Sequence, residues 1–438
     1  MSGLCTVSKV TFALLTSKYE CSILETLGML ALKSVNQCYS PTAEILYLLE
    51  CFRHMVNDCV EIGLLHNVTA LKRLSMLSWE RRRVYKCPAY YKASALSRAV
   101  GILAARKKSL RRGIPSRDPY SLRPQITAYQ GFKIKDGSLR IPVGGRKFQH
   151  LPLTKRTLSV LSEPGLRVRS FTLTSTALSL CISKEIPEVG CVGAIGVDRN
   201  LRNLTVGDEE QVVHYDLSET LRIAATTMRI VRSFKRNDSR IRKVIASKYG
   251  QRRSNRTQHL LHNTTKRVVA QALKTRKAIV LENIEGIRRL YRRGNGQGRQ
   301  FRGRINGWSF GEAQRQIEYK ARWSGIPFIR LSRKETQGTS VTCLRCGERL
   351  QEDKRLRRKL WCSECRIMMD RDVVAAVNLS QRGRLRFDRS RAQHGLQGGA
   401  AEAVKGNPTA TVILGVDASK PGNQGSTDDL AEPVTPLA

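Results

Sequence analysis

The stretch CVGAIGVDRNLRNLTV (191–206) decides the fold. It begins with a run of apolar residues typical of a buried strand, and this run ends at Asp198. Short segments rich in β-branched residues follow at 204–206 and 212–215, and they are expected to continue as hairpin strands. A carboxylate at the end of a buried strand is costly unless it has a partner, which makes Asp198 a candidate functional residue.

Two further acidic positions lie at the ends of apolar elements. The buried strand KAIVLE (277–282) ends at Glu282, and Asp370 and Asp372 open the last predicted helix, at about 372–381. Two acids from strand ends and one from a helix start can converge on two magnesium ions roughly 3.5–4 Å apart. Three hairpin-like strands, a helix, a fourth strand and a terminal helix, in this order, are the layout of the RNase H-like fold. Taken alone, Asp370 is more readily explained as the N-cap of the helix.

Four of the twelve cysteines form two closely spaced pairs. Two residues separate Cys343 from Cys346, two separate Cys362 from Cys365, and fifteen residues lie between the pairs. Two such pairs supply the four tetrahedral ligands of a structural zinc ion and leave no position open for catalysis. The sequence therefore predicts one structural zinc.

The charge of the chain indicates its partners. Its 438 residues include 77 Lys and Arg against 36 Asp and Glu, a formal charge of +41. This charge favours a nucleic acid over an anionic membrane surface. No apolar run approaches the roughly 18–20 residues that a membrane span needs, and no secretory signal is recognisable. The eight remaining cysteines are scattered singly, which is typical of a reducing compartment, so we expect a cytoplasmic protein.

Two basic segments are the candidate nucleic-acid contacts, one in the N-terminal half and one between the cysteine pairs. Arginines contact phosphates and tyrosines stack on bases, although tyrosines at this spacing are more often part of a core. A basic zinc ribbon favours phosphate contact over a merely solvated face. The candidates are Arg81, Arg82, Arg83, Tyr85, Arg357 and Arg358.

The rest of the chain is divided by its patterning. Residues 4–16 are rich in β-branched residues and predict a strand, whereas residues 21–112 show helical spacing of apolar residues. Residues 113–187 alternate at period two and predict a small β-barrel-like unit, which the N-terminal strand could complete. Residues 288–304 are rich in Arg and Gly and predict a basic loop. From residue 396 onward the composition is too polar to bury a core.

Several segments resemble TnpB, the family of RNA-guided nucleases encoded by bacterial and archaeal transposons and related to the type V CRISPR effectors. IGVDRNLRNLTV (195–206), VLENIEGI (280–287) and DRDVVAAVNL (370–379) resemble the first, second and third RuvC motifs of the family. TSVTCLRCG (339–347) is similar to the segment that enters its zinc ribbon, and EYKARWSGIPFIRL (318–331) to the helix and strand before it. These segments spread over nearly half of the chain.

The resemblance implies a multidomain α/β protein. It would comprise an RNase H-like (RuvC-type) nuclease domain with an inserted zinc ribbon, an N-terminal helical recognition region, a small β-barrel-like wedge domain and a mostly disordered tail. The nuclease domain is expected at 190–381, with the zinc ribbon at 339–368, and the helical recognition region at 21–112. The wedge domain is expected to combine 1–20 with 113–189, and the tail to occupy 382–438.

The resemblance also implies an RNA-guided DNA endonuclease. Such an enzyme uses Mg²⁺ to cleave DNA phosphodiesters at a guide-matched target beside a short flanking motif. Asp198, Glu282 and Asp372 would be the catalytic, metal-binding triad, holding two magnesium ions in addition to the one structural zinc. The expected partners are guide RNA and target DNA, with no membrane, in a nucleoid-associated protein of a bacterium or archaeon.

Three positions depart from the family pattern. Asn200 and Arg366 stand where the family usually has Gly, and Val374 stands where it usually has Asn. None of the three is an expected metal ligand, so an active nuclease is the favoured interpretation. A catalytically silent RNA-guided DNA-binding regulator and an RNA-independent transposase are the alternatives.

Overall fold

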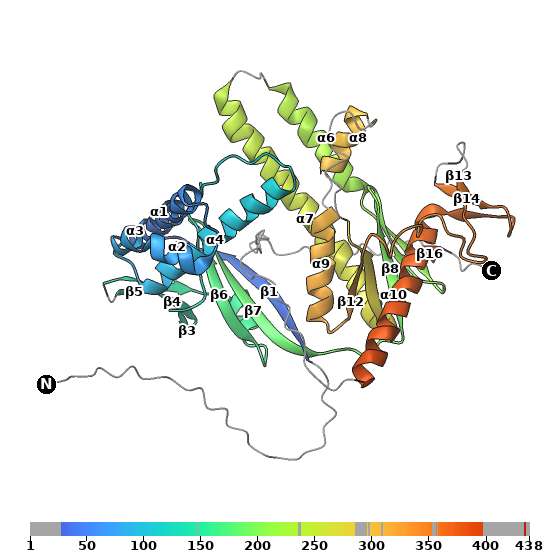
Figure 1. Ribbon diagram of the computed structural model, residues 1–438, viewed down its shortest axis with the longest axis horizontal. Coiled ribbons are helices and arrows are strands. Elements are labelled where there is room, and N and C mark those ends of the chain that lie inside the picture. Colours follow the sequence, from blue (N-terminus) through green and yellow to red (C-terminus); the bar gives the residue numbers. More distant parts are fainter. Residues whose placement is uncertain are drawn as a thin grey trace, which may run out of the picture.

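The computed structural model describes residues 28–145, 147–234, 238–284, 296, 298–307, 310–352, 356, 358–396 and 433–434 (Figure 1). The strand predicted at 4–16 lies outside the described residues, as does the part of the wedge domain expected at 1–20.

A six-stranded sheet organises the C-terminal half of the chain. Its strands are β8 (Gly193–Arg199), β9 (Asn203–Gly207), β10 (Val212–Asp216), β11 (Lys277–Glu282), β12 (Phe328–Leu331) and β16 (Pro433–Val434), in the spatial order β12-β11-β8-β9-β10-β16. Strands β8, β9 and β10 are antiparallel neighbours, and β11 runs parallel to both β8 and β12. The predicted sequence of three hairpin strands followed by a fourth strand is confirmed.

Helices cover both faces of this sheet. On one face, α7 (Ala246–Thr275) and α9 (Phe310–Trp323) share an apolar core with β8, β9 and β11. On the other face lies α10 (Arg371–Leu396), which approaches β8 so closely that a Cβ at Gly196 would collide with the Ala376 carbonyl. The helices α6 (Ser218–Ser233) and α8 (Arg299–Gly307) and the short π-helix η1 (Ile241–Ile245) complete this half.

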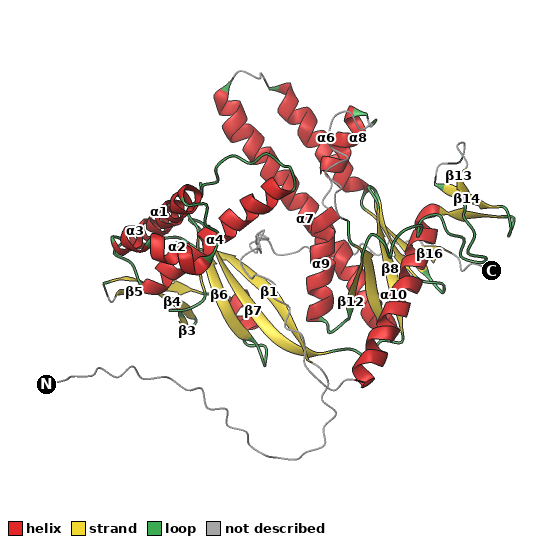
Figure 2. Cartoon of the chain, in the orientation of Figure 1, coloured by secondary structure: helices red, strands yellow, loops and turns green. Residues whose placement is uncertain are grey.

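The N-terminal half contains two antiparallel sheets. The first has the order β1-β7-β6-β2 and the second the order β3-β4-β5. The strands are β1 (Gly28–Cys38), β2 (Ile126–Ala128), β3 (Lys133–Lys135), β4 (Ser138–Gly144), β5 (Lys147–Pro152), β6 (Arg167–Leu173) and β7 (Ala177–Pro187). The helices are α1 (Ala43–Leu65), α2 (Leu71–Leu77), α3 (Trp79–Arg83), α4 (Ala89–Arg111) and α5 (Lys155–Leu161). Both sheets pack into one core with α1 and α4. In Figure 2, α7 and α9 lie between the β1 sheet and the β8 sheet.

The helical prediction for 21–112 is wrong at β1. All eleven residues of this strand pair with β7, and its inward residues Ala31, Val35 and Gln37 follow the two-residue period of a strand. The sequence GMLALKSVNQC also fits helical spacing, because a short apolar run is compatible with either structure. The long pairing partner, which is distant in sequence, decides between them. An early strand thus does complete the β unit, but it lies at 28–38.

Two predicted irregular segments are partly helical. Helix α8 occupies 299–307 and overlaps the end of the segment predicted as a basic loop at 288–304. Helix α10 continues to Leu396, so the first part of the tail predicted at 382–438 is ordered. Arginine, leucine, glutamine and alanine are good helix formers, which favours this extension. Gly383 does not end the helix: a Cβ at this position would collide with Val280 of β11, so the glycine allows close packing on the sheet.

The third small sheet forms the ribbon around the cysteines. It consists of β13 (Gln351–Glu352), β14 (Lys359–Cys362) and β15 (Ile367–Asp370), and β15 leads directly into α10. Among the residues that the structure describes, none of the helices has the length and apolar character required to cross a membrane.

Candidate metal centres

The three predicted acids lie at one end of the six-stranded sheet. Glu282 is the last residue of β11, and because Leu281 pairs with Val197 of the parallel strand β8, Glu282 lies level with Asp198. Asp372 is 5% exposed in the first turn of α10, which packs on β8. Burial, and then the negative charges of Asp372 and Glu282, raise the pKa of Asp198 to about 7. The charges of Asp372 and Glu282 therefore act on Asp198, which places the three carboxylates in one region.

An arginine from the ribbon contacts this region. The Asn200 amide donates to Asp198 Oδ2 (2.7 Å), and Arg358 Nη2 donates to Asn200 Oδ1 (2.8 Å). Arg358 also forms an ion pair with Asp372 Oδ1. Asn200 and Arg358 thus connect the acid of β8 to the acid of α10. The hydrogen bond from Asn200, and then the positive charge of Arg358, offset part of the rise in the pKa of Asp198.

Asp370 caps helix α10. Its Oδ1 accepts hydrogen bonds from the backbone N–H groups of Asp372 (2.9 Å) and Val373 (3.4 Å), as an N-cap carboxylate does. Its other carboxylate oxygen lies 3.6 Å from Lys359 Nζ. The capping role expected for Asp370 is therefore seen in the structure, and the choice of Asp372 as the third acid stays a prediction.

Arg199, the residue after Asp198, was not predicted to have a role near the three acids. Arg199 is 4% exposed and points to the opposite face of β8, toward α9. Burial lowers its pKa to about 10, although the nearby charges of Glu282 and Asp198 act in the opposite direction, so it remains a cation at neutral pH. The burial of Arg199 could not be predicted from the sequence, because a charged residue at the end of an apolar strand can equally face solvent.

The chemistry of the acidic donor set fits magnesium, a hard cation that prefers oxygen ligands. In the described part of the chain, only the four cysteines gather three or more ligand atoms within 4.8 Å of one another. The oxygens of Asp198, Glu282 and Asp372 are therefore spread more widely than a single coordination sphere.

The four predicted cysteines form one cluster. The sulfur atoms of Cys343 and Cys365 are 3.8 Å apart, and those of Cys346 and Cys362 are 3.5 Å apart. A tetrahedral zinc ion with Zn–S bonds of about 2.3 Å requires sulfurs about 3.8 Å apart, so the cluster fits zinc. Burial would raise the pKa of Cys343, but backbone N–H groups of Cys346 and Arg345 outweigh it and lower the pKa to about 7. This shift favours the thiolate that binds metal.

The predicted nucleic-acid contacts have different environments. Arg81 and Arg83 are exposed on α3 and pair with Glu61 and Glu80 at the surface.

Arg82 is only 5% exposed and donates to Ser78 and to Ser75, so its predicted role as a surface contact is wrong. Arg82 is the middle residue of three consecutive arginines, and helix α3 directs its side chain toward the protein interior. Tyr85 is half-buried against the core and donates to Asp58 (2.7 Å). Arg357 lies outside the described residues.

A cleft of about 930 Å³ separates the β1 sheet from helices α7 and α9. Its wall is strongly basic and includes one acid, Glu318, which pairs with Arg322 and Arg330. The basic residues of the wall are Lys33, Arg98, Arg156, Arg169, Arg315 and Arg322. This cleft could not be predicted, because its walls come from segments that are distant from one another in the sequence.

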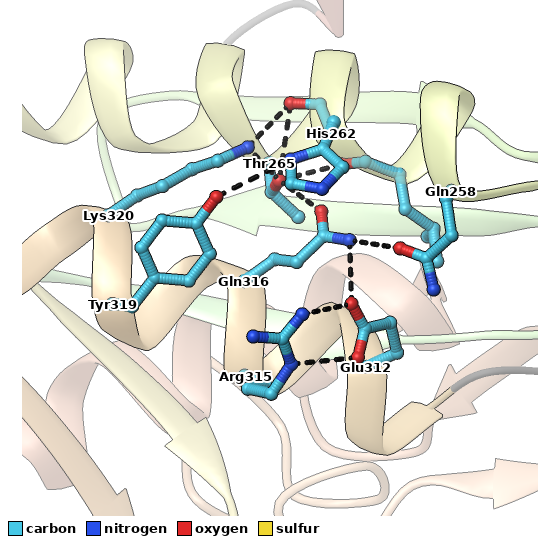
Figure 3. A network of polar contacts seen from close by, with 9 residues as sticks. Gln258, His262, Thr265, Glu312, Arg315, Gln316, Tyr319 and Lys320 are labelled. Carbon is cyan, nitrogen blue, oxygen red and sulfur yellow. Dashed lines mark hydrogen bonds and ion pairs between the residues drawn. The ribbon is translucent and has the colours of Figure 1, made fainter. Parts of the chain in front are cut away.

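A polar network fixes part of the cleft wall (Figure 3). Glu312 accepts from Nε (2.8 Å) and Nη2 (2.6 Å) of Arg315, and from the buried Gln316 (2.9 Å). Gln316 in turn accepts from Thr265 of α7 (3.0 Å), which ties α9 to α7. Lys320 donates to Thr265 as well (2.7 Å). Arg315 is thus held in one orientation at the cleft surface.

Comparisons with known proteins agree with the motifs. Residues 310–379 match the family model of the Cas12f1-like TNB domain. A TnpB-like protein of Methanocaldococcus jannaschii is 36% identical over 139 residues, which are 31% of this chain. The resemblance to TnpB is confirmed. The aligned part of this TnpB-like chain spans about half, 46%, of that relative.

A solved structure has the same fold. The cryo-EM structure of a Cas12f1–sgRNA–target DNA complex matches with a TM-score of 0.52 and 15% sequence identity. The match covers 77% of the TnpB-like chain and 82% of the solved chain.

The structure accommodates the three departures from the TnpB pattern. Asn200 does not have the positive φ that favours glycine, and its side chain binds Asp198 and Arg358. Val374 is fully buried in the apolar core of the ribbon, so its packing replaces the hydrogen bonds of an asparagine. Arg366 has a φ of 54°, which explains why glycine suits this position.

Proposed function

We propose that this TnpB-like chain is an RNA-guided DNA endonuclease that cleaves phosphodiesters in a magnesium-dependent reaction. The observation that carries the proposal is that Asp198, Glu282 and Asp372 lie at the same end of the six-stranded sheet. The net charge of +41 and the likeness to a fold that was solved with sgRNA and target DNA support nucleic-acid partners.

The three carboxylates would hold two magnesium ions, which supply an activated water and charge stabilisation for in-line attack on the phosphate. Asp198 and Glu282 project from rigid neighbouring strands, and the N-terminal turn of α10 fixes Asp372. Arg358 now pairs with Asp372 and Asn200. Its half-exposed side chain at the ribbon edge would be able to contact the phosphate of the substrate once the carboxylates bind metal.

The basic cleft would bind the backbone of the guide RNA. Five arginines and one lysine line it, and the Glu312 pair holds Arg315 ready for phosphate contact without a further loss of side-chain freedom (Figure 3). Cysteines 343, 346, 362 and 365 would hold the one structural zinc that stabilises the ribbon.

A catalytically silent regulator is the second candidate, favoured by the ion pair that Arg358 makes with Asp372. The test is to sequence the RNA that co-purifies with the protein and to offer a plasmid that matches its guide segment. Cleavage in Mg²⁺ is the expected result. A bound RNA with binding but no cleavage at any magnesium concentration would favour the regulator, and the absence of a discrete RNA would favour an RNA-independent transposase.

A further inference from the structure

Arg199 connects three elements beneath the acidic site. It belongs to β8, directly after Asp198, and because successive side chains of a strand alternate, it extends to the face opposite the carboxylate. Its Nη2 donates to the backbone carbonyl of Glu282, at the end of β11. Its Nη1 donates to the carbonyl of Phe310 (3.2 Å), the first residue of α9, and to Oε1 of Gln314 (2.8 Å), one turn further along the helix.

These hydrogen bonds require a planar group with several donors. The two ends of the guanidinium reach different elements, so one side chain fixes the distance between the end of β11 and the start of α9. A lysine would keep the charge but could not span both partners in fixed directions. The three acceptors are all neutral, so the guanidinium is not neutralised by the groups that orient it.

The charge of Arg199 lies close to the acids. Burying a cation is costly unless negative charge compensates for it, and the charges that influence Arg199 most are those of Glu282 and Asp198.

We infer that Arg199 is a positioning residue of the metal site: by holding the Glu282 carbonyl against the first turn of α9, it orients the Glu282 carboxylate for metal binding. This inference rests on the proposed function in assigning Glu282 to the magnesium site. Groups that orient metal ligands typically change metal affinity by about 10–100-fold when they are replaced.

Direct titration with Mn²⁺, with free Mn²⁺ measured by electron paramagnetic resonance on the zinc-loaded, RNA-free full-length protein, tests the inference. Arg199→Lys is expected to weaken Mn²⁺ binding at least about tenfold. The matched control is Arg330→Lys, because Arg330 is near the site but pairs with Glu318 at the surface. It should leave the affinity unchanged. A purely structural role would lower the melting temperature of Arg199→Lys without changing Mn²⁺ affinity well below that temperature, and this result would overturn the inference.

Gln314→Ala decides the question if Arg199→Lys does not fold. Gln314 is half-buried on α9 and accepts from Arg199, so its removal loosens the guanidinium without a large cavity. It should weaken Mn²⁺ binding severalfold, and unchanged binding would contradict the inference. Asp198→Asn separates this inference from the proposed function. If Asp198→Asn leaves Mn²⁺ binding intact, the metal site itself is misassigned; if only Asp198→Asn weakens it, Arg199 has no positioning role.

Discussion

Arg366 has a φ of 54° at the turn after the last cysteine, a conformation that is unfavourable for any residue with a Cβ. We predict that Arg366→Gly stabilises the ribbon by about 1 kcal/mol. Denaturant unfolding of the zinc-loaded protein, followed by Trp361 fluorescence on β14, measures the change.

Arg349→Gly is the matched control, because this exposed ribbon residue does not have a positive φ. The same substitution there should destabilise by about 0.5–1 kcal/mol through the added freedom of the unfolded chain. If both substitutions changed the free energy of unfolding in the same direction, the backbone angle of Arg366 would not explain the effect of Arg366→Gly.

Single residues also show which parts of the site a sequence can reveal. Asp198 and Glu282 interrupt apolar strands, and this local contrast is visible without a structure. Asp370 and Asp372 have the same side chain two residues apart, and the cap geometry separates their roles. The inward orientation of Arg82 and Arg199 depends on packing with distant elements, so their burial could not be predicted.

The zinc ribbon is a structural element whose folding depends on its metal ion. Its three short strands enclose a small core around Leu360 and Met369, which is too small to be stable by itself. We predict that removal of zinc by a chelator, or Cys346→Ser, unfolds the ribbon and frees the start of α10, while the β1 sheet stays folded. Hydrogen exchange should then rise at β14 and remain slow at β7. Protection of β14 that is unchanged in metal-free protein would contradict the zinc assignment.

The end of α10 gives a prediction about truncation. Arg382 donates to the carbonyls of Glu335 and Gln337, and Arg386 donates to the carbonyl of Arg330. A chain that ends after Ser390 keeps these contacts and should fold with nearly the full melting temperature. A chain that ends after Gln381 loses them and should melt several degrees lower. Equal melting temperatures of the two truncated chains would show that these arginine contacts contribute little to stability.

The elements predicted best are those whose apolar pattern is contained within one continuous segment of the sequence. Strand β8 was predicted to within two residues at each end, because a continuous apolar run that ends at a charged residue is typical of a buried strand. Strand β1 was missed because its sequence suits two structures and its partner β7 is distant along the chain. The basic cleft could not be predicted for the same reason, because it forms only where segments distant in the sequence pack together.

The cleft gives a prediction for the whole molecule. Arg156 and Arg169 are exposed in its wall, and their joint replacement by Ala should weaken binding of the co-purified RNA. If each contacts one phosphate, the slope of log K against log salt should become shallower by about 1–2. Arg53→Ala with Arg106→Ala makes the same change in charge away from the cleft and should have a much smaller effect. Equal effects of the two double variants would indicate a general effect of charge.

The central claim is that three carboxylates at the end of the β8 sheet hold the metal that cleaves guide-matched DNA. The most direct measurement is cleavage of a matched plasmid in Mg²⁺ by wild type, Asp372→Asn and Asp370→Ser, each loaded with the same RNA. Wild type should cut, Asp372→Asn should bind the target but not cut, and Asp370→Ser should cut because serine also caps a helix. Normal cleavage by Asp372→Asn would contradict the account.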